Sequence, residues 1–378
     1  MSITRKLHHL IESKLKPAKV CLLFGVRRVG KTVLIKNLAS KYEGKTMLLN
    51  GEDYNAQQLL SEQSIANYKR LFENTDLLII DEAQAIPKIG QKLKLMVDEI
   101  SHLKIIATGS SAFDLLNKSG EPLTGRSYTF YMHPIAQSEL REKENLIETK
   151  GKLEERLIFG SYPEVITMNS LAEKEEYLKD LVVSYLLKDI LIIDGIRNSS
   201  KMLDLLKLIA YQVGNEVSYD ELGKQLGMSK NTVEKYLDLL TKVFILKKLS
   251  AYSGNLRKEI SKNTKWYFTD NGVRNALIGN FQPLALRNDV GALWENYIIN
   301  ERIKFLEYTE NRKELFFWRT YDHQEIDWVE LKNEKLEAFE FKWNNNKKTK
   351  APEAWTKNYP EATFTKIDTL NYLDWIGA

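Results

Sequence analysis

Residues suited to phosphate chemistry lie near the start of the chain. Residues 25–32, GVRRVGKT, fill the pattern G-x-x-x-x-G-K-[ST], in which glycines leave room for a phosphate and backbone N–H groups point at it. In this pattern Lys31 is expected to reach the β- and γ-phosphates of a nucleotide, and Thr32 to ligate Mg²⁺. The predicted nucleotide-binding residues are Gly25, Val26, Arg27, Arg28, Val29, Gly30, Lys31, Thr32 and Val33.

Two further stretches end apolar runs with polar residues. TDLLIIDEAQ ends its run at Asp81 and Glu82, where P-loop NTPases carry a Mg²⁺-holding carboxylate and a glutamate that polarises the attacking water. Asp81 is therefore predicted to be the metal residue and Glu82 the catalytic base. The alternative is a solvated helix start, which is less favoured beside an intact P-loop. KIIATGSSAF supplies Ser110 as the candidate sensor of the γ-phosphate, on a strand between the other two.

These residues require strands that end at a common edge of a sheet. A parallel α/β sheet is predicted because helical patterns separate most of the strand-like runs, and ligand sites in such sheets lie at the strand C-termini. Cys21, the single cysteine, is expected to be a buried strand residue, so an internal disulfide is excluded. The strand-like runs are residues 19–25, 45–50, 76–81, 104–109 and 127–132.

Composition describes an ordinary globular chain of 378 residues, 43% hydrophobic and 28% charged, long enough for two or three domains. No apolar run approaches the ~18 residues of a membrane-spanning helix, and residues 1–16 lack the apolar core of a signal peptide. We therefore expect a cytoplasmic protein without a membrane partner. The net charge of +4 is small, but residues 223–265 hold ten Lys or Arg against three Asp or Glu.

This basic stretch contains a helix-turn-helix pattern. VSYDELGKQLGMSKNTVEKYLDLL predicts a short helix, a turn around Gly227 and a second helix capped by Ser229, and residues 245–268 suit a β-wing. A winged helix of this kind either contacts DNA or docks a protein, and its charges can also be a solvated face. The predicted DNA-contacting residues are Lys230, Asn231, Thr232 and Lys235 of the second helix, with Arg257 and Lys258 of the wing.

A carboxylate cluster is predicted near the end of the chain, in HQEIDWVELKNEKLEAFEFKW, residues 323–343. The two-residue period of a strand places Glu340 and Lys342 on one face. Asp327 on an adjacent strand and Glu295 on a packed helix would complete a second, tentative Mg²⁺ site. Ion pairs with Lys342 are the alternative explanation of this cluster. Stacking on bases is the less favoured role for the nearby tryptophans, and sheet packing is the expected one, at Trp318, Trp328 and Trp343.

The motifs GVRRVGKT, LLIIDEAQ, ATGSSAF and EPLTGRSYTFYMHPI resemble AAA+ superfamily ATPases of the archaeal and bacterial type, AAA_14-like, with a DUF4143 C-terminal region. FGSYPEVI and YLLKDIL resemble the start of that region, and the last hundred residues resemble its PD-(D/E)xK nuclease-like, restriction-endonuclease-like end. The loop departs from the family pattern at Val26 and Arg28, where proline and glutamine are usual. The resemblance implies a P-loop AAA+ domain over 1–150, a helical region with a winged helix over 151–272, and a nuclease-like domain over 273–378.

The same resemblance implies ATP and Mg²⁺ as ligands, self-association as a hexamer, and a catalytic role for Arg126 as an arginine finger, either in its own subunit or across a subunit interface. A surface arginine that fixes a turn is the alternative for Arg126. Three functions follow as expectations. The first is an ATP-hydrolysing protein that couples nucleotide state to DNA binding or remodelling, such as branched-DNA processing. The second is an ATP-regulated DNA endonuclease, and the third a protein-directed ATPase switch.

Overall fold

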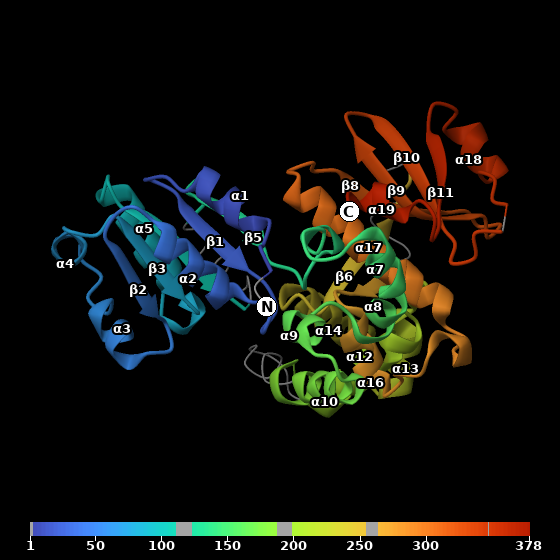
Figure 1. The fold of residues 1–378 in the computed structure, drawn as a ribbon, viewed down its shortest axis with the longest axis horizontal. Coiled ribbons are helices and arrows are strands. Elements are labelled where there is room, and N and C mark those ends of the chain that lie inside the picture. The colour runs from blue at the N-terminus through green and yellow to red at the C-terminus, as the bar shows by residue number, and fades with distance from the viewer. Residues whose placement is uncertain (1–2, 111–122, 187–198, 255–263, 347) are drawn as a thin grey trace. The chain divides into compact units, whose positions relative to one another are not determined.

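The computed structural model describes residues 3–110, 123–186, 199–254, 264–346 and 348–378. The chain divides into two compact units, each built on one sheet (Figure 1). The first unit holds residues 2–133 and 242–244, and the second holds residues 134–241 and 245–378. Among the described residues, no helix combines the length and the apolar character needed to cross a bilayer.

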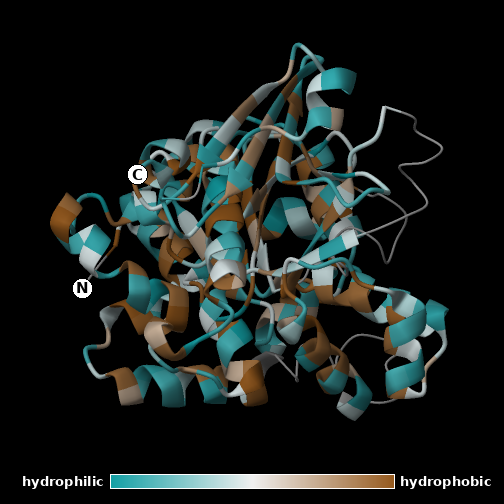
Figure 2. Ribbon diagram, turned by 90° about the vertical axis from the view of Figure 1, so that its right-hand side faces the viewer, coloured by the Kyte–Doolittle hydropathy of each residue, from teal (hydrophilic) through white to brown (hydrophobic). Residues whose placement is uncertain are grey.

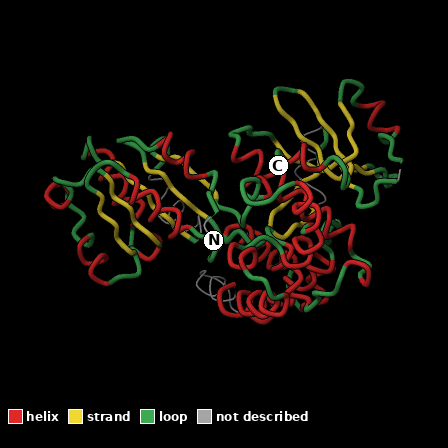
Figure 3. The backbone as a smooth tube through the Cα atoms, in the orientation of Figure 1, coloured by secondary structure: helices red, strands yellow, loops and turns green. Residues whose placement is uncertain are grey.

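The first unit contains a five-stranded parallel sheet in the order β2-β3-β4-β1-β5, with its strands drawn yellow in Figure 3. The five strand-like runs of the sequence all form strands of this sheet, so the predicted parallel α/β fold is confirmed. Its strands are β1 (Val20–Phe24), β2 (Thr46–Asn50), β3 (Leu77–Asp81), β4 (Lys104–Gly109) and β5 (Ser127–Tyr131).

Burial explains the apolar character of these runs. Every residue of β1 and β3 is buried, because a central strand of a parallel sheet is covered on both faces. Leu78 and Ile80 share a core cluster with Met96 and Val97 of α5. Cys21 is buried as predicted, and burial raises the pKa of its thiol to about 12. The helices of this unit are α1 (Leu7–Lys14), α2 (Lys31–Lys41), α3 (Tyr54–Leu59), α4 (Ile65–Leu71) and α5 (Ile89–Glu99), with a 3₁₀ turn at Ala83–Ala85.

The second unit contains a six-stranded mixed sheet in the order β11-β10-β9-β8-β6-β7. The antiparallel pair β6–β7, predicted as a wing, continues the sheet of the C-terminal strands through a short parallel pairing of β6 with β8. The predicted boundary at residues 272 and 273 lies within this unit, and the division into three domains stays a prediction. The strands are β6 (Leu246–Ala251), β7 (Thr264–Phe268), β8 (Glu314–Arg319), β9 (Glu325–Lys332), β10 (Lys335–Phe341) and β11 (Thr363–Ile367).

Helices precede and flank this second sheet, and their hydrophobic and hydrophilic positions alternate along the ribbon in Figure 2. They are α7 (Leu146–Gly151), α8 (Leu153–Phe159), α9 (Pro163–Thr167), α10 (Leu171–Leu181), α12 (Ser199–Tyr211), α13 (Tyr219–Leu226), α14 (Lys230–Lys242), α16 (Asn271–Ile278), α17 (Val290–Tyr308), α18 (Glu353–Asn358) and α19 (Tyr372–Ile376). Short turns lie at Gln137–Glu139 and Leu284–Leu286 (3₁₀) and at Val182–Leu186 (π).

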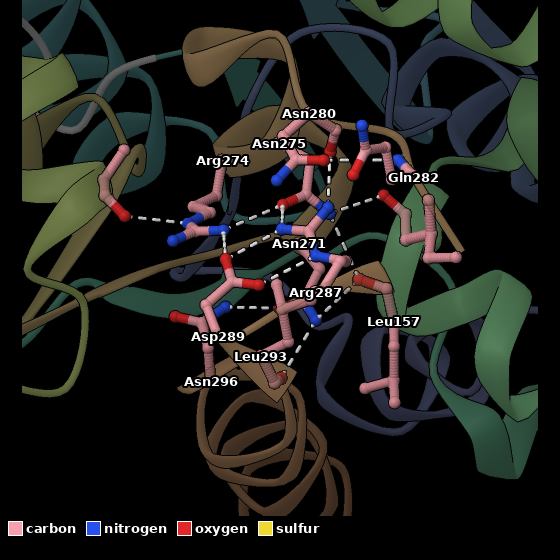
Figure 4. A network of polar contacts seen from close by, with 12 residues as sticks. Leu157, Asn271, Arg274, Asn275, Asn280, Gln282, Arg287, Asp289, Leu293 and Asn296 are labelled. Carbon is pink, nitrogen blue, oxygen red and sulfur yellow. Dashed lines mark hydrogen bonds and ion pairs between the residues drawn. The ribbon is translucent and has the colours of Figure 1, made fainter. Parts of the chain in front are cut away.

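A buried polar network fixes the start of α17 (Figure 4). Arg274 of α16 donates to the carbonyl of Ala210 at 2.8 Å and pairs with Asp289. Arg287 donates to both oxygens of Asp289 at 2.8 Å and to Asn275 at 3.0 Å. Burial alone would raise the pKa of the Asp289 carboxyl, but hydrogen bonds and charge from the two arginines lower it to about 2. The network therefore ties α12 and α16 to the helix that carries Glu295.

Candidate functional site

The predicted phosphate loop lies between β1 and α2, at the carboxyl edge of the parallel sheet. Gly30 stands before α2 with a φ of 97°, a left-handed conformation that favours glycine. A Cβ at Gly25 would lie 2.3 Å from the carbonyl oxygen of Met132, so only glycine fits this close approach. The Lys31 ammonium is buried inside the loop and donates to the carbonyl oxygens of Gly25 at 2.8 Å and Val26 at 3.1 Å.

Hydrogen bonds link the ends of β3 and β4 to the start of α2 beside this loop. The Thr32 hydroxyl, at the start of α2, donates to Asp81 Oδ2 at 2.7 Å. Thr108 of β4 donates its hydroxyl to the other oxygen of Asp81, and its oxygen accepts the Glu82 N–H at 3.1 Å. Asp81 is buried at the end of β3. The predicted magnesium residues Thr32 and Asp81 thus lie together, with Glu82 next to them.

Ser110 lies at the same edge, and β4 runs between β1 and β3 as the sequence predicted. Gln84 donates to Glu82 Oε2 at 2.5 Å and to Ser110 Oγ at 3.3 Å, so the predicted base and the predicted sensor share one neighbour. The sequence reasoning missed Gln84 and Thr108. Both stand inside the quoted motifs, and the small polar residues that end the β4 run were the signal for Thr108.

Arg5 is a further residue that the sequence reasoning missed. It is buried, and its guanidinium donates to the carbonyl oxygen of Val29 at 2.7 Å and to that of His133 at 2.6 Å. Val29 belongs to the phosphate loop, and His133 follows the end of β5. Arg5 therefore anchors the backbone of the loop to the neighbouring strand end.

Arg126 does not join this site within the chain. Its carbonyl accepts the N–H of Val20 at 2.8 Å, so it lies at the amino end of β1, whereas the phosphate loop follows the carboxyl end. Five strand residues separate the two edges by about 16 Å at about 3.3 Å per residue. The Arg126 side chain is half-exposed and forms an ion pair of 2.6 Å with Asp98. If Arg126 contacts a nucleotide, that nucleotide would have to be bound to another subunit.

The second predicted site gathers residues of four elements in the second unit. Tyr267 of β7 donates to Glu295 of α17 at 2.6 Å, and the Lys265 ammonium on the same strand lies 3.7 Å from that carboxylate. Asp327 of β9 accepts the N–H of Phe341 at 2.8 Å. Lys342 pairs with Glu340 at 2.6 Å, which is the ion pair that the sequence left open as an alternative. We call Lys265, Tyr267, Glu295, Asp327, Glu340 and Lys342 the carboxylate cluster.

Electrostatic shifts show that these groups interact. Burial, against the opposing charge of Lys265 and with the added charge of Asp327, raises the pKa of Glu295 to about 7. Burial and the Asp327 charge also raise the pKa of Glu340. Burial acts to lower the pKa of Lys265, but Glu295, Asp327 and Glu325 together raise it. The structure therefore brings the four predicted residues together and adds Lys265 and Tyr267, which sequence reasoning assigned only to a wing.

The charge of the carboxylate cluster suits a divalent cation, but its oxygen atoms do not lie close enough together to bind one. Carboxylates outnumber cations around it, because Glu325 and Glu216 also pair there with Lys265 and Arg319. However, a set of three ligand atoms within 4.8 Å of one another occurs, over the described ranges, at His8, His9 and Glu12 and not in this cluster. An ion here would therefore require movement of the carboxylates, and Lys265 already balances part of their charge.

The two predicted helices and the turn at Gly227 form, as α13 and α14, while their role as a DNA-binding winged helix stays a prediction. Gly227 ends α13 in a left-handed conformation, and the Ser229 oxygen accepts the N–H of Thr232 at 3.2 Å to cap α14. The exposed face of α14 carries three of the predicted DNA-contacting residues, Lys230, Asn231 and Lys235. The Thr232 hydroxyl is within 2.8 Å of the Ser229 hydroxyl, and Arg257 and Lys258 lie outside the described residues. The expected packing role is confirmed for Trp318 and Trp328, which are buried, while Trp343 packs edge-on against Trp294.

Three family models match successive parts of the chain. Residues 17–141 match the AAA domain, residues 150–284 match a domain of unknown function, DUF8612, and residues 290–369 match another, DUF4143. An uncharacterized protein of Mycobacterium tuberculosis is 27% identical over 325 residues, covering 83% of this chain and 68% of that protein. An uncharacterized protein of Methanocaldococcus jannaschii is 23% identical over 381 residues, which cover 96% of this chain and 82% of that protein.

Solved structures also show similarity. A signal transduction ATPase with numerous domains from Pyrococcus horikoshii has 15% identity and a TM-score of 0.32. The match covers 82% of this chain and 48% of that chain. A RuvB mutant of Thermotoga maritima has 18% identity and a TM-score of 0.29, and the match covers 64% of this chain and 85% of that chain. The chain thus joins an N-terminal region that matches the AAA domain to a C-terminal region that matches DUF4143.

Proposed function

We propose that this protein binds ATP with Mg²⁺, hydrolyses it, and couples its nucleotide state to DNA binding or remodelling. The observation that carries the ATPase part is the hydrogen-bonded link from Thr32 through Asp81 to Thr108, beside the Lys31 ammonium. A Mg²⁺-nucleotide needs oxygen ligands, a cation near the phosphates and a base near the attacking water. One edge of the sheet offers all of these groups: the oxygen ligands of Thr32 and Asp81, the cation of Lys31 and the carboxylate of Glu82.

Each residue has a distinct role in this proposal. Lys31 would leave its loop carbonyls to contact the β- and γ-phosphates, and Thr32 and Asp81 would hold Mg²⁺, which neutralises phosphate charge when bound. Glu82 would orient and deprotonate the attacking water. Gln84, which donates to both Glu82 and Ser110, would position the Glu82 carboxylate. Arg126 would act on the nucleotide of a neighbouring subunit in a ring, a hexamer by analogy. Its exposed pair with Asp98 contributes about 0.2–1 kcal/mol, so release from it costs little.

DNA coupling is supported by two exposed lysines of α14, Lys230, which lies 3.7 Å from Asp220, and Lys235. We expect the double variant Lys230→Ala, Lys235→Ala to weaken DNA binding and to remove DNA stimulation of ATP turnover, because these lysines would neutralise phosphates. The slope of log affinity against log salt concentration should fall by about one per lost contact. The measurement is ATP turnover with and without single-stranded, duplex and branched DNA, with DNA affinity measured at several salt concentrations.

The matched control is Lys179→Ala, an exposed lysine on α10 outside the helix-turn-helix, which should leave both readouts unchanged. If ATP turnover ignores DNA in the unmodified protein, DNA coupling is wrong and a protein-directed switch is the better description. The ATPase part of the proposal would survive that result.

Endonuclease activity is a second candidate, favoured by the gathering of Glu295, Asp327, Glu340 and Lys342 from separate elements. We expect Asp327→Asn to lower any Mg²⁺-dependent nicking rate by at least about 10²-fold, since it removes a metal-binding charge. Denaturing gels of supercoiled or branched DNA provide the measurement, with ATP turnover as the internal control. Glu353→Gln, at an exposed carboxylate of α18, should nick normally. Equal nicking by the Asp327→Asn variant would assign the cleavage to a contaminant or to another site.

A further inference from the structure

Helix α1 carries a group of potential metal ligands that the proposed ATPase does not use. Its sequence begins Leu7, His8, His9, and one turn later reaches Glu12. Glu12 Oε2 lies 3.1 Å from His8 Nδ1 and 3.4 Å from His9 Nδ1. All three ligand atoms lie within 4.8 Å of one another. Ligands that bind zinc tetrahedrally at about 2.0–2.2 Å stand about 3.4 Å apart, so this spacing suits one shared ion.

The environment of His8 supplies an independent indication. His8 is 6% exposed, and within the described structure neither of its ring nitrogens forms a hydrogen bond. Nδ1 of His8 lies 3.1 Å from the Glu12 carboxylate, but the two groups are not aligned as a hydrogen bond requires. A buried polar group without a partner costs about 1–3 kcal/mol. An ion on the Nδ1 lone pair would replace the missing partner.

We propose that His8, His9 and Glu12 bind one divalent transition-metal ion, with zinc as the best match. Imidazole nitrogens with a carboxylate oxygen suit zinc, cobalt or nickel, whereas Mg²⁺ prefers oxygen ligands alone. His9 is exposed and Glu12 half-exposed, which gives the ion an entry path from solvent. Three protein ligands leave the fourth position for water or a further ligand, as in open zinc sites. The site is separate in chemistry from the oxygen ligands Thr32 and Asp81.

The test measures Zn²⁺ and Co²⁺ binding to the full chain without an affinity tag, in excess Mg²⁺ to occupy oxygen-ligand sites. Titration calorimetry should give one Zn²⁺ per chain, and Co²⁺ should give the visible absorption of a tetrahedral nitrogen and oxygen site. We expect His9→Ala and Glu12→Gln to weaken Zn²⁺ binding by at least about tenfold, the smallest loss seen when even an outer partner of a metal ligand is removed. Both side chains are at least partly exposed, so the fold should persist.

Two controls make the result decisive. His323→Ala removes another exposed histidine of the chain, outside the group, and should bind Zn²⁺ as the unmodified protein does. Circular dichroism of each variant checks that the fold is kept. Unchanged affinity in His9→Ala, or no binding by the unmodified protein, would overturn the proposal and leave only side-chain contacts between Glu12 and the two histidines.

Discussion

Replacing Lys31 by alanine is expected to lower the turnover number for ATP by about 10²–10³-fold, the cost of removing one preorganised group that stabilises transition-state charge. Lys31 is the buried cation of the phosphate loop, and its ammonium is 2.8 Å from the Gly25 carbonyl oxygen. The same substitution should weaken ATP binding, because the ammonium contacts phosphates in both the ground state and the transition state. Steady-state phosphate release and binding of a fluorescent ATP analogue measure the two effects.

A matched control and a contrasting variant make this result specific. Lys36→Ala, at an exposed lysine of the same helix α2, should turn over ATP normally. Glu82→Gln should keep ATP binding while losing about 10²–10⁴-fold in turnover, since it removes only the base for the attacking water. If Lys31→Ala retained full turnover, ATP hydrolysis would not occur at this loop, and the assignment of Asp81 and Glu82 would fail with it.

The arrangement of residues at the phosphate loop was predictable because its signals are local. The phosphate loop, Asp81 and Ser110 each end an apolar run, and parallel strands bring their carboxyl ends to one edge. The runs indicated that the strand of Ser110 lies between the other two, but they did not indicate which side chains would meet, so the sequence could not show that Thr108 would bridge Asp81 and Glu82. Arg5 escaped notice because it contacts the loop from 24 residues away, and no local pattern marks such a contact.

The carboxylate cluster shows a different limit. Its four predicted residues follow strand and helix periodicity, and they do come together. Lys265 and Tyr267 could not be placed there, because only the pairing of β6 with β8 brings the β6–β7 hairpin into the C-terminal sheet. A lysine within the apolar run KWYF was the available signal, since a buried lysine needs a carboxylate partner. Arg126 lies away from the phosphate loop of its own chain because it directly precedes β5, at the amino edge of the parallel sheet.

Glu330→Gln is expected to destabilise the second unit by about 3–5 kcal/mol, the cost of breaking a buried ion pair from one side. Glu330 of β9 is fully buried, and Arg302 of α17 donates to its two oxygens at 2.7 and 2.8 Å. Lys313 and Trp328 donate to the same carboxylate at 2.6 and 2.9 Å. The amide would leave Arg302 without its carboxylate partner and remove one of the two carboxylates that pair with Lys313. It would thereby loosen α17, which carries Glu295, from the sheet.

Urea unfolding followed by tryptophan fluorescence measures this loss without a signal from the first unit, because all seven tryptophans lie between residues 266 and 375. Glu337→Gln is the matched control, since Glu337 pairs with the same Lys313 from a half-exposed position, where solvent screening limits the contribution of an ion pair to about 1 kcal/mol. Equal destabilisation by the two variants would contradict the special role of the buried carboxylate.

The pH dependence of the Glu330→Gln effect gives an independent check of its electrostatic origin. Burial would raise the pKa of Glu330, but hydrogen bonds and charge from Arg302, with Lys313 and Trp328, lower it below the ordinary value. A carboxyl whose pKa is lower in the folded than in the unfolded chain stabilises the fold above the unfolded pKa, about 4.3. That stabilisation is lost as the pH falls through the folded pKa. The difference in unfolding free energy between the unmodified protein and Glu330→Gln should therefore be constant near neutral pH and shrink below about pH 4. A difference that did not change in acid would mean that lost packing, and not lost charge, causes the destabilisation.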